Sequence, residues 1–431
     1  MPGSHLALEA IVWQDDRLIA RCLLRRGRYV IGQERKNEIV VDDESISGKH
    51  ARLTVASDEE FSLEDLGSAN GTFVDGQAIN GVTPVTLESR ITLGQTTLAF
   101  QRGGLPASVF SQLPEGFLRT SRYAIGKKIV EGRTSTIYEA QDTVLQRTVA
   151  MKALHRAGQM NAPQVLAFIR ENQIVAQLTH TNILPIYDFG IDEEVGLFCA
   201  TRFVEGESFG VLLSGMASGD PQAPHATLHA LLGVFLKTCD AVAFAHARGV
   251  VHGSLRPEAV LFGRFGEVFI DHWGFARVGQ PLDEERPPIK APAITTRPPV
   301  SRYIAPEQAN GAEEITPATD VYSLGTILFR ILTLRHFNTG ESEEEIVARA
   351  LESSRTAADT FATAPPPKHI PGGILAERLT AICARALSFD AKERFATAHD
   401  LKQEITAALE QPAAGQERHS SWKLSGLFSR R

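Results

Sequence analysis

The periodicity of apolar residues changes near residue 120, and this change most restricts the possible folds. Between residues 7 and 102, apolar and polar residues alternate with the two-residue period of half-buried strands, and turn signals such as Asn70-Gly71 separate the runs. After Pro163, apolar residues recur every three to four positions, which is typical of helices that bury one face. A chain of 431 residues is also too long for one compact core. The sequence therefore predicts an all-β domain followed by a domain that begins with strands and becomes mostly helical.

The predicted boundaries follow composition as well as periodicity. Residues 103–119 contain glycine, proline and serine without periodicity and are predicted to form a linker. Strand-like runs between residues 124 and 154 precede the helical patterns, which predicts a small lobe of about 120–205 and a larger, helical lobe of about 206–410. The predicted segments are a β-sandwich at 7–102, the linker at 103–119, a two-lobed domain at 120–410 and a tail at 411–431, with long helical patterns at 228–247, 320–334, 375–387 and 397–409.

Composition and charge narrow the class of protein. A hydrophobic content of 43% is ordinary for a globular protein, and a formal net charge of −7 argues against general nucleic-acid binding. The longest apolar stretch, 322–334, is interrupted by Arg330 and is too short to span a bilayer, so we expect a buried helix and a cytoplasmic protein. Scattered cysteines without a CxxC pair predict neither a disulfide framework nor a metal site; they are Cys22, Cys199, Cys239 and Cys383.

Three motifs of the β domain occur in a fixed order: YVIG at 29–32, SGKH at 47–50 and DLGSANGT at 65–72. Together they resemble the forkhead-associated (FHA) family, and the resemblance covers residues 7–102. Domains of this family bind phosphothreonine through charge-assisted hydrogen bonds from their loops. The resemblance implies that Ser47 and Asn70 bind phosphate and that His50 is a structural brace of the loop.

Two phosphate-binding positions of the FHA pattern differ in this chain. Gln33 stands where the family has an Arg, and Gly48 stands where the residue after the serine is a further donor. The loss of a charged donor costs roughly 1.5–3 kcal/mol, or about one to two decades of affinity. Arg35 and Lys49 lie close in sequence and are candidates to compensate. Two interpretations are open: weakened phosphopeptide binding, and a folded domain that no longer binds phosphate.

The second domain contains segments that resemble the bacterial-type Ser/Thr protein kinase family over residues 120–410. VAMK at 149–152 matches the lysine strand, YIAPE at 303–307 matches a segment of the large lobe, and DVYSLG at 320–325 matches its buried helix. The resemblance implies the two-lobed α+β fold of protein kinases, so the predicted fold class is multidomain. It also implies structural roles for Glu307, Asp320 and Arg394.

Several positions that perform phosphoryl transfer in this family hold other residue types here. The reaction needs a loop over the phosphates, a magnesium site and an Asp oriented on the attacking hydroxyl. In the catalytic loop, Ser254 replaces the Asp base and Ala259 replaces the Asn ligand of magnesium. His272 occupies the Asp position of the metal-binding motif, and we expect the adjacent Asp271 to face away because neighbouring strand residues point to opposite sides. The glycine-rich loop keeps only Gly132, so the sequence predicts no metal site and no catalytic residue.

Lys152 and Glu171 still match the family and allow two interpretations. One is binding of ATP without magnesium, to which Gly132 and Arg256 would contribute; no cofactor would be required. The other is an ion pair that only braces the small lobe. The overall prediction is a catalytically inactive kinase-fold scaffold or regulator that docks to phosphorylated signalling proteins. The alternatives are an active atypical Ser/Thr kinase and a nucleotide sensor that does not hydrolyse ATP.

Two further segments carry weaker signals. Thr295 and Thr296 lie in the proline-rich stretch 278–302 and are candidate phosphorylation sites, although exposed threonines in such loops usually have no regulatory role. The tail at 411–431 combines apolar residues such as Trp422 with basic ones, so contact with a partner or with an anionic membrane surface is one interpretation. A disordered chain end is the interpretation that we favour.

Overall fold

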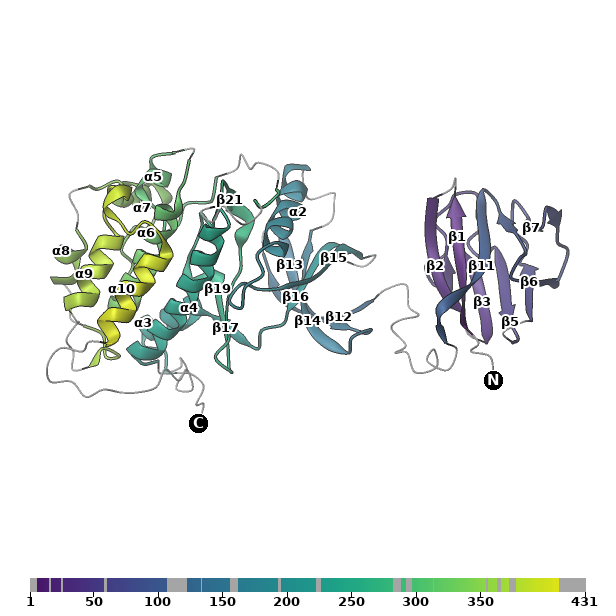
Figure 1. Ribbon diagram of the computed structural model, residues 1–431, viewed down its shortest axis with the longest axis horizontal. Coiled ribbons are helices and arrows are strands. Elements are labelled where there is room, and N and C mark those ends of the chain that lie inside the picture. The colour runs from purple at the N-terminus through teal and green to yellow at the C-terminus, as the bar shows by residue number, and fades with distance from the viewer. Residues whose placement is uncertain are drawn as a thin grey trace. The chain divides into compact units, whose positions relative to one another are not determined.

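The computed structural model places an all-β domain in the N-terminal part of the chain and a two-lobed domain after it (Figure 1). The residues that it describes are 6–14, 17–24, 26–57, 60–106, 122–132, 134–155, 162–192, 195–221, 226–281, 288–291, 297–312, 314–353, 356–362, 366–371 and 377–410.

Two β-sheets form the N-terminal domain. Its strands are β1 (Leu6–Gln14), β2 (Arg17–Leu24), β3 (Gly27–Gly32), β4 (Ile39–Val40), β5 (Ala51–Val55), β6 (Phe61–Asp65), β7 (Thr72–Val74), β8 (Gln77–Ala78), β9 (Thr83–Val85), β10 (Ile91–Leu93) and β11 (Thr96–Pro106). One sheet has the order β2-β1-β11-β10-β7-β8 and the other the order β4-β3-β5-β6-β9. Alternate residues of each strand face inward, as in β5, where Ala51, Leu53 and Val55 are buried. Buried side chains from both sheets form one core, which is the arrangement of a sandwich.

The strand pattern agrees with the alternation in the sequence, with two differences. β8 and β9 are too short to produce a visible alternation, and the sequence did not predict them. β11 runs to Pro106, although the predicted linker begins at residue 103. The reason is long-range pairing: β1 and β11 are antiparallel, with Leu6 opposite Pro106, so the partner strand keeps the glycine-rich end of β11 extended.

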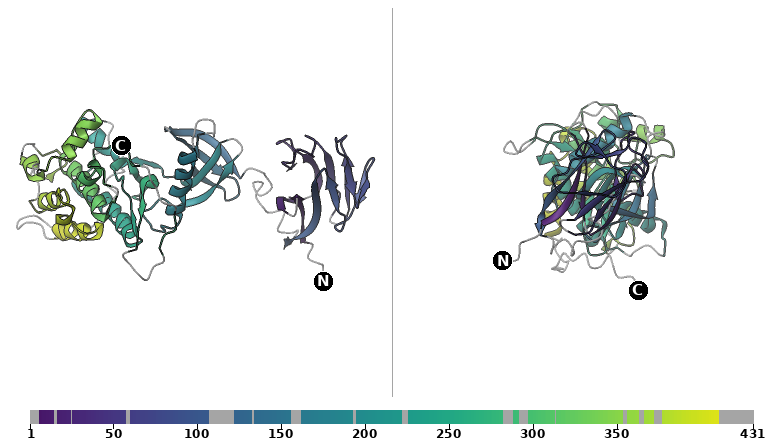
Figure 2. Two further views of the ribbon diagram at one scale, coloured as in Figure 1. Left: turned by 90° about the horizontal axis from the view of Figure 1, so that it is seen from above. Right: turned by 90° about the vertical axis from the view of Figure 1, so that its right-hand side faces the viewer.

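The small lobe of the second domain is a five-stranded sheet with one helix against it. The sheet order is β12-β13-β14-β16-β15, and Phe168 of the helix stacks near Phe189 of β15, with ring centroids 5.9 Å apart. Figure 2 shows this helix beside the strands from a second direction. The elements are β12 (Tyr123–Glu131), β13 (Ser135–Asp142), β14 (Arg147–Leu154), α2 (Ala162–Ala176), β15 (Ile186–Asp192) and β16 (Gly196–Arg202).

The large lobe is mostly helical. Its helices are α3 (Phe209–Ser218), α4 (Leu228–Ala247), α5 (Pro306–Ala309), α6 (Pro317–Thr333), α7 (Glu343–Ala350), α8 (Ala357–Ala362), α9 (Glu377–Ala386) and α10 (Ala398–Glu410). Short strands lie at its border with the small lobe: β17 (Gly206–Ser208), β18 (Val250–Val251), β19 (Val260–Gly263), β20 (Val268–Ile270) and β21 (Arg277–Val278). Thr227 begins α4 because its hydroxyl accepts a hydrogen bond from the Ala230 amide.

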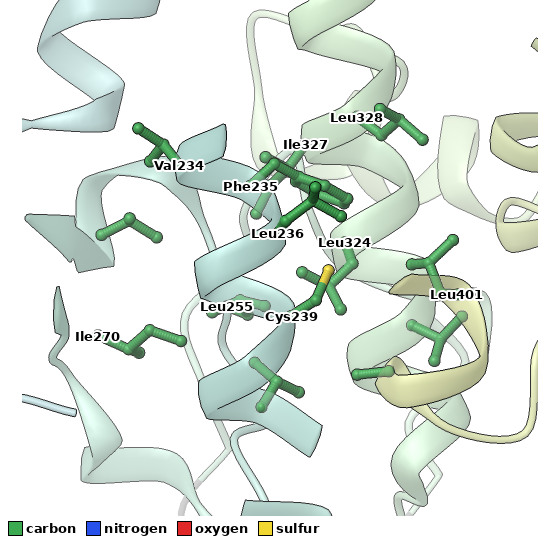
Figure 3. Close-up of a cluster of buried hydrophobic side chains, with 14 of the residues drawn as sticks. Val234, Phe235, Leu236, Cys239, Leu255, Ile270, Leu324, Ile327, Leu328 and Leu401 are labelled. Atoms are coloured by element: carbon green, nitrogen blue, oxygen red, sulfur yellow. The ribbon is translucent and has the colours of Figure 1, made fainter. Parts of the chain in front are cut away.

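Helix α4 is the centre of the large-lobe core. Figure 3 shows Phe235 and Cys239 of α4 facing Leu324 of α6 and Leu401 of α10. Among the described residues, α4 is the one helix long and apolar enough to cross a membrane by length and composition. Of its most apolar 18-residue window, 61% is buried inside the domain, so burial in the core explains why this helix is apolar.

The predicted fold class, a β-sandwich followed by a two-lobed α+β domain, is confirmed. The predicted helices at 228–247, 320–334, 375–387 and 397–409 correspond to α4, α6, α9 and α10. Helix α6 begins three residues earlier than predicted, at Pro317, a residue type that fits the first turn of a helix. Thr295, Thr296 and the tail at 411–431 lie outside the described residues.

Candidate functional site

The loops that the FHA resemblance singles out are joined by side-chain hydrogen bonds. Ser47 Oγ accepts from the Ala69 amide at 2.9 Å, and Asn70 Nδ2 donates to the Ser45 carbonyl at 2.7 Å. The structure therefore brings Ser47 and Asn70 together at one end of the sandwich. His50 is fully buried, with Nε2 donating to the Gly71 carbonyl at 3.1 Å and Nδ1 accepting from the Ser47 amide at 3.1 Å. These contacts are those of a brace between the loops.

Gln33, at a position that departs from the FHA pattern, donates to Ser47 through its backbone amide, whereas its side chain donates elsewhere. Gln33 Nε2 donates to the Asp43 carbonyl at 2.9 Å, so its amide is used within its own part of the domain. Gly48 has no side chain to offer. Arg35 and Lys49 are exposed residues on the same two loops. Their compensating role stays a prediction.

Lys152 of β14 and Glu171 of α2 form an ion pair in the small lobe. Lys152 Nζ lies 3.2 Å from both carboxylate oxygens of Glu171. The side chains are 24% and 13% exposed, so solvent screens this pair less than a surface pair. Burial alone would lower the pKa of Lys152, but the carboxylates of Glu171 and Asp271 outweigh it and raise that pKa. The lysine is therefore charged and held toward two carboxylates.

Asp271 is the first residue after β20, which ends at Ile270. Its charge contributes to the raised pKa values of both Lys152 and Cys199. That its carboxylate faces away from Lys152, as strand alternation suggests, stays a prediction. His272 then turns the chain with φ +66°, in a left-handed region that Asp, Asn and His enter more readily than most residues.

The imidazole of His272 lies beside this carboxylate. Its Nδ1 is 3.6 Å from Asp271 Oδ2. Burial would raise the pKa of Asp271, but the charges of His272 and Lys152 lower it below its ordinary value. The residue next to His272, which occupies the metal-binding Asp position of the family, is thus a carboxylate whose pKa the neighbouring residues lower. Among the described residues, no group of three or more His, Cys, Asp or Glu side chains is placed to hold a metal ion.

Asp320 of α6 accepts hydrogen bonds from the backbone of the loop that follows β18. Its Oδ2 accepts from the His252 amide at 2.7 Å and from His246 Nε2 at 2.9 Å, and its Oδ1 accepts from the Gly253 amide at 2.8 Å. Burial would raise the pKa of Asp320, but the hydrogen bond from His246 and the charges of the two histidines lower it. Asp320 thus fixes the backbone of the loop, in line with the structural role that the resemblance implies.

The loop that Asp320 supports has neither an acidic base nor a metal-binding oxygen in the side chains at the two positions where the family has them. Ser254 is partly exposed, and its amide donates to His252 Nδ1 at 3.3 Å. Ala259 is fully buried, and its carbonyl accepts from the Asp271 amide at 2.9 Å. The structure therefore brings Ala259 next to Asp271 and places a methyl group where a metal ligand is expected.

Gly132 and Arg256 are the remaining residues that were predicted to contact a nucleotide. The Gly132 amide donates to the Ser135 carbonyl at 2.9 Å, which uses that amide to close the turn between β12 and β13. Arg256 lies just before the short 3-10 helix Pro257–Ala259, and its Nε is 4.0 Å from Glu258 Oε2. Whether Gly132 and Arg256 contact a nucleotide stays a prediction.

Glu307 and Arg394 form a two-pronged ion pair in the large lobe. Arg394 Nη1 and Nη2 each lie 2.9 Å from one carboxylate oxygen of Glu307, and the Arg394 side chain is 0% exposed. Thr319 Oγ1 adds a hydrogen bond to the same carboxylate at 2.8 Å. Burial would raise the pKa of Glu307, but the hydrogen bond and charge of Arg394 lower it. This pair ties α5 and α6 to the segment before α10.

Arg170 is a buried residue that the sequence did not single out. It precedes Glu171 on α2, is 4% exposed, and donates from Nη2 to the Ala276 carbonyl at 2.9 Å. It therefore joins α2 to the segment that follows His272. The apolar spacing did not point to it, because Arg170 is two residues from Phe168 and therefore lies on a different face of the helix.

Comparison with known protein families finds two matches, one for each of the two domains. The family model described as Protein kinase domain matches residues 123–405, which is more than half of the chain. The chain belongs to the protein kinase family. A second family model, described as FHA domain, matches residues 29–94 within the sandwich. The two-lobed domain is therefore a kinase domain, preceded by an FHA domain.

The relatives found by sequence comparison are named as kinases. Serine/threonine-protein kinase PknD of Protochlamydia amoebophila is 30% identical over 310 residues, which are 68% of this chain and 30% of that protein. PknD of Chlamydia pneumoniae is 28% identical over 70% of this chain and 34% of its own length. A probable serine/threonine-protein kinase of Streptomyces coelicolor, SCO3848, is 30% identical over 68% and 41%. The chain therefore matches well under half the length of each of these relatives.

Proposed function

We propose that this chain is a catalytically inactive regulator with a protein-kinase fold, docked to phosphothreonine proteins by its FHA domain. The observation that carries the proposal is the buried Ala259 beside the Asp271 backbone, at the position of a magnesium ligand. Ser254 at the position of the catalytic base supports it. Direct measurement of phosphate transfer by the purified chain is its test.

The size of the rate contributions that this chain lacks favours an inactive protein. A general base contributes about 10²–10⁴ to a rate, and a serine hydroxyl is a poor proton acceptor near pH 7. Metal ions supply several kcal/mol of stabilisation to the charge that develops on the phosphates, at about 1.4 kcal/mol per decade of rate. The Ala259 side chain offers magnesium no oxygen, and the carboxylate of the neighbouring Asp271 lies 3.6 Å from His272 Nδ1.

Any ATP binding is expected to be nearly indifferent to magnesium. Lys152 supplies a charge for phosphates, whereas neither Ala259 nor His272 supplies an oxygen for the metal. Calorimetric titration of the full chain with ATP, with magnesium or with a chelator, should give affinities within about tenfold of each other. A larger gain with magnesium would reveal a metal site, and Asp271→Asn, which removes the carboxylate 3.6 Å from His272 Nδ1, would then abolish that gain.

An active Ser/Thr kinase is the second candidate, and specific observations favour it. The relatives are named as Ser/Thr kinases, and family membership agrees with activity at least as well as with inactivity. The charge of Asp271 acts on Lys152, so this candidate has a carboxylate near the lysine at a position that the family motif does not use. Phosphate transfer that depends on both Lys152 and Asp271 would support it over the inactive regulator.

We propose further that the FHA domain docks to phosphothreonine peptides and that the protein acts in the cytoplasm. Binding of a degenerate phosphothreonine peptide library to the full chain is expected to be weak and to depend on Ser47 and Asn70. Ser47→Ala removes a hydroxyl donor to the phosphate and should lower affinity about tenfold or more, as measured by fluorescence anisotropy. Tight binding that Ser47→Ala leaves unchanged would move the binding site away from these loops.

A further inference from the structure

The Glu34 side chain lies beside Gly48, the residue that follows the predicted phosphate-binding serine. Gly48 follows Ser47, and a β-carbon added at Gly48 would lie 3.0 Å from Glu34 Oε1 and 3.1 Å from Glu34 Cγ. Glu34 therefore covers the position at which the FHA pattern has a further phosphate donor. A negative group stands where a phosphate ligand needs a positive or neutral donor.

The backbone holds Glu34 in this place. The Glu34 amide donates to the Gly48 carbonyl at 3.0 Å, and the Gln33 amide donates to the Ser47 carbonyl at 3.2 Å. Asn37, which is buried, adds a bond from Nδ2 to the Gly48 carbonyl at 2.6 Å. The loop at 33–37 is thus fastened to Ser47 and Gly48, which keeps the backbone of Glu34 next to Gly48.

The charge of Glu34 is only weakly compensated. Its Oε2 lies 3.0 Å from Lys36 Nζ, but the Lys36 side chain is 71% exposed and that of Glu34 is 42% exposed. Exposed pairs of this kind are screened by solvent and contribute little. A phosphate dianion bound at Ser47 would therefore meet a nearby negative charge, and like charges placed together oppose binding.

We propose that Glu34 is a specificity-determining residue that disfavours phosphorylated ligands at the Ser47–Asn70 site. This inference rests on the proposed docking function and deepens it. The weak phosphopeptide binding expected of this domain has two causes: loss of donors at Gln33 and Gly48, and repulsion by Glu34. Only the second is removed when the carboxylate becomes an amide of the same shape.

Glu34→Gln in the full chain tests the repulsion. The probes are a fluorescent degenerate phosphothreonine peptide library and the same library without phosphate, titrated by anisotropy. Affinity for the phosphorylated library should rise about tenfold, and the rise should shrink in high salt because screening weakens the charge effect. Affinity for the unphosphorylated library should not change. Glu60→Gln is the matched control, because this exposed residue precedes β6 and so lies at the opposite strand end from the Ser47 loop.

Gly48→Arg supplies the second arm. The Gly48 backbone is not in the left-handed region, and the three atoms nearest to an added β-carbon all belong to the Glu34 side chain. Arg at this position would pair with Glu34 and gain little for phosphate. Glu34→Gln together with Gly48→Arg should therefore raise phosphopeptide affinity by more than the product of the two single effects.

The outcomes separate the inference from the docking proposal. If Gly48→Arg binds phosphopeptides and Glu34→Gln equals the unaltered protein, the role of Glu34 is overturned and docking stands. An equal gain for both libraries would also overturn it, because the effect would not concern phosphate. If not even the double variant distinguishes phosphorylated from unphosphorylated peptides, both the inference and phosphothreonine docking are overturned.

Discussion

Purified protein incubated with radiolabelled ATP, magnesium and a generic basic protein substrate should transfer no more phosphate than its Lys152→Met variant. The reason is the combined loss of the base at Ser254 and of metal ligands at Ala259 and His272. Each of these groups acts on the same transition state, so their contributions are not additive. Ser254→Asp alone would place a base beside an empty metal site and gain little.

The smallest change expected to give detectable turnover is the combination of Ser254→Asp, Ala259→Asn and His272→Asp. The His272 position favours this change, because its left-handed backbone, with φ +66°, suits Asp. Ala259 is fully buried, so Asn there requires its neighbours to move slightly. The triple variant carrying Lys152→Met as well is the matched control, and its labelling should fall back to background.

Robust labelling by the unaltered protein, abolished by Lys152→Met, would contradict the inactive reading. Asp271→Asn would then identify the missing metal ligand. If Asp271→Asn also abolishes labelling, the neighbouring carboxylate has taken over the role that the family assigns to the His272 position. If labelling persists, the metal is held elsewhere in the chain.

Arg394→Met should destabilise the kinase domain by about 3–5 kcal/mol, because it leaves the Glu307 carboxylate partly buried and without its ion partner. For a domain of this size, the midpoint of thermal unfolding should fall by roughly 6–20 °C. Differential scanning calorimetry is the measurement, since it resolves the transitions of separate domains. A change below about 1 kcal/mol would mean that the neighbouring hydrogen bonds carry the contact instead.

Lys402→Met is the control for this comparison. Lys402 Nζ lies 2.6 Å from Asp240 Oδ1, but the two side chains are 32% and 37% exposed. A solvent-screened pair of this kind is worth about 1 kcal/mol or less. The contrast between the two variants therefore compares a buried arginine, which also donates to three backbone carbonyls, with a solvent-screened lysine pair in the same lobe.

The Arg394 pair also has a predictable pH dependence. The pKa of Glu307 is lowered from its ordinary value of 4.5, chiefly by Arg394 acting against burial. A carboxylate with a lowered folded-state pKa stabilises the protein fully above its unfolded pKa, and this stabilisation is lost as the pH falls through the folded value. The unaltered protein should therefore lose more stability below pH 4.5 than Arg394→Met does.

Local patterns were sufficient for most of the fold. The two-residue alternation at 7–102 and the three-to-four spacing after Pro163 predicted the sandwich and the major helices, because burial of one face imposes these periods on any sequence. Helix α4 matches its predicted bounds, since Thr227 caps one end within the same segment. The end of β11 was missed, because Pro106 is kept extended by Leu6, which lies far away in the sequence.

The motifs by themselves determined which residue types stand at the catalytic and phosphate-binding positions, since motif spacing is a property of the chain alone. Only the tertiary structure decided where the neighbouring carboxylates point. Asp271 lies close enough for its charge to act on Lys152, and Glu34 lies beside Gly48 in a loop that backbone hydrogen bonds fasten to it. Charges act through space over distances that bear no relation to sequence separation, so the electrostatics of both sites could be known only once the loops were placed.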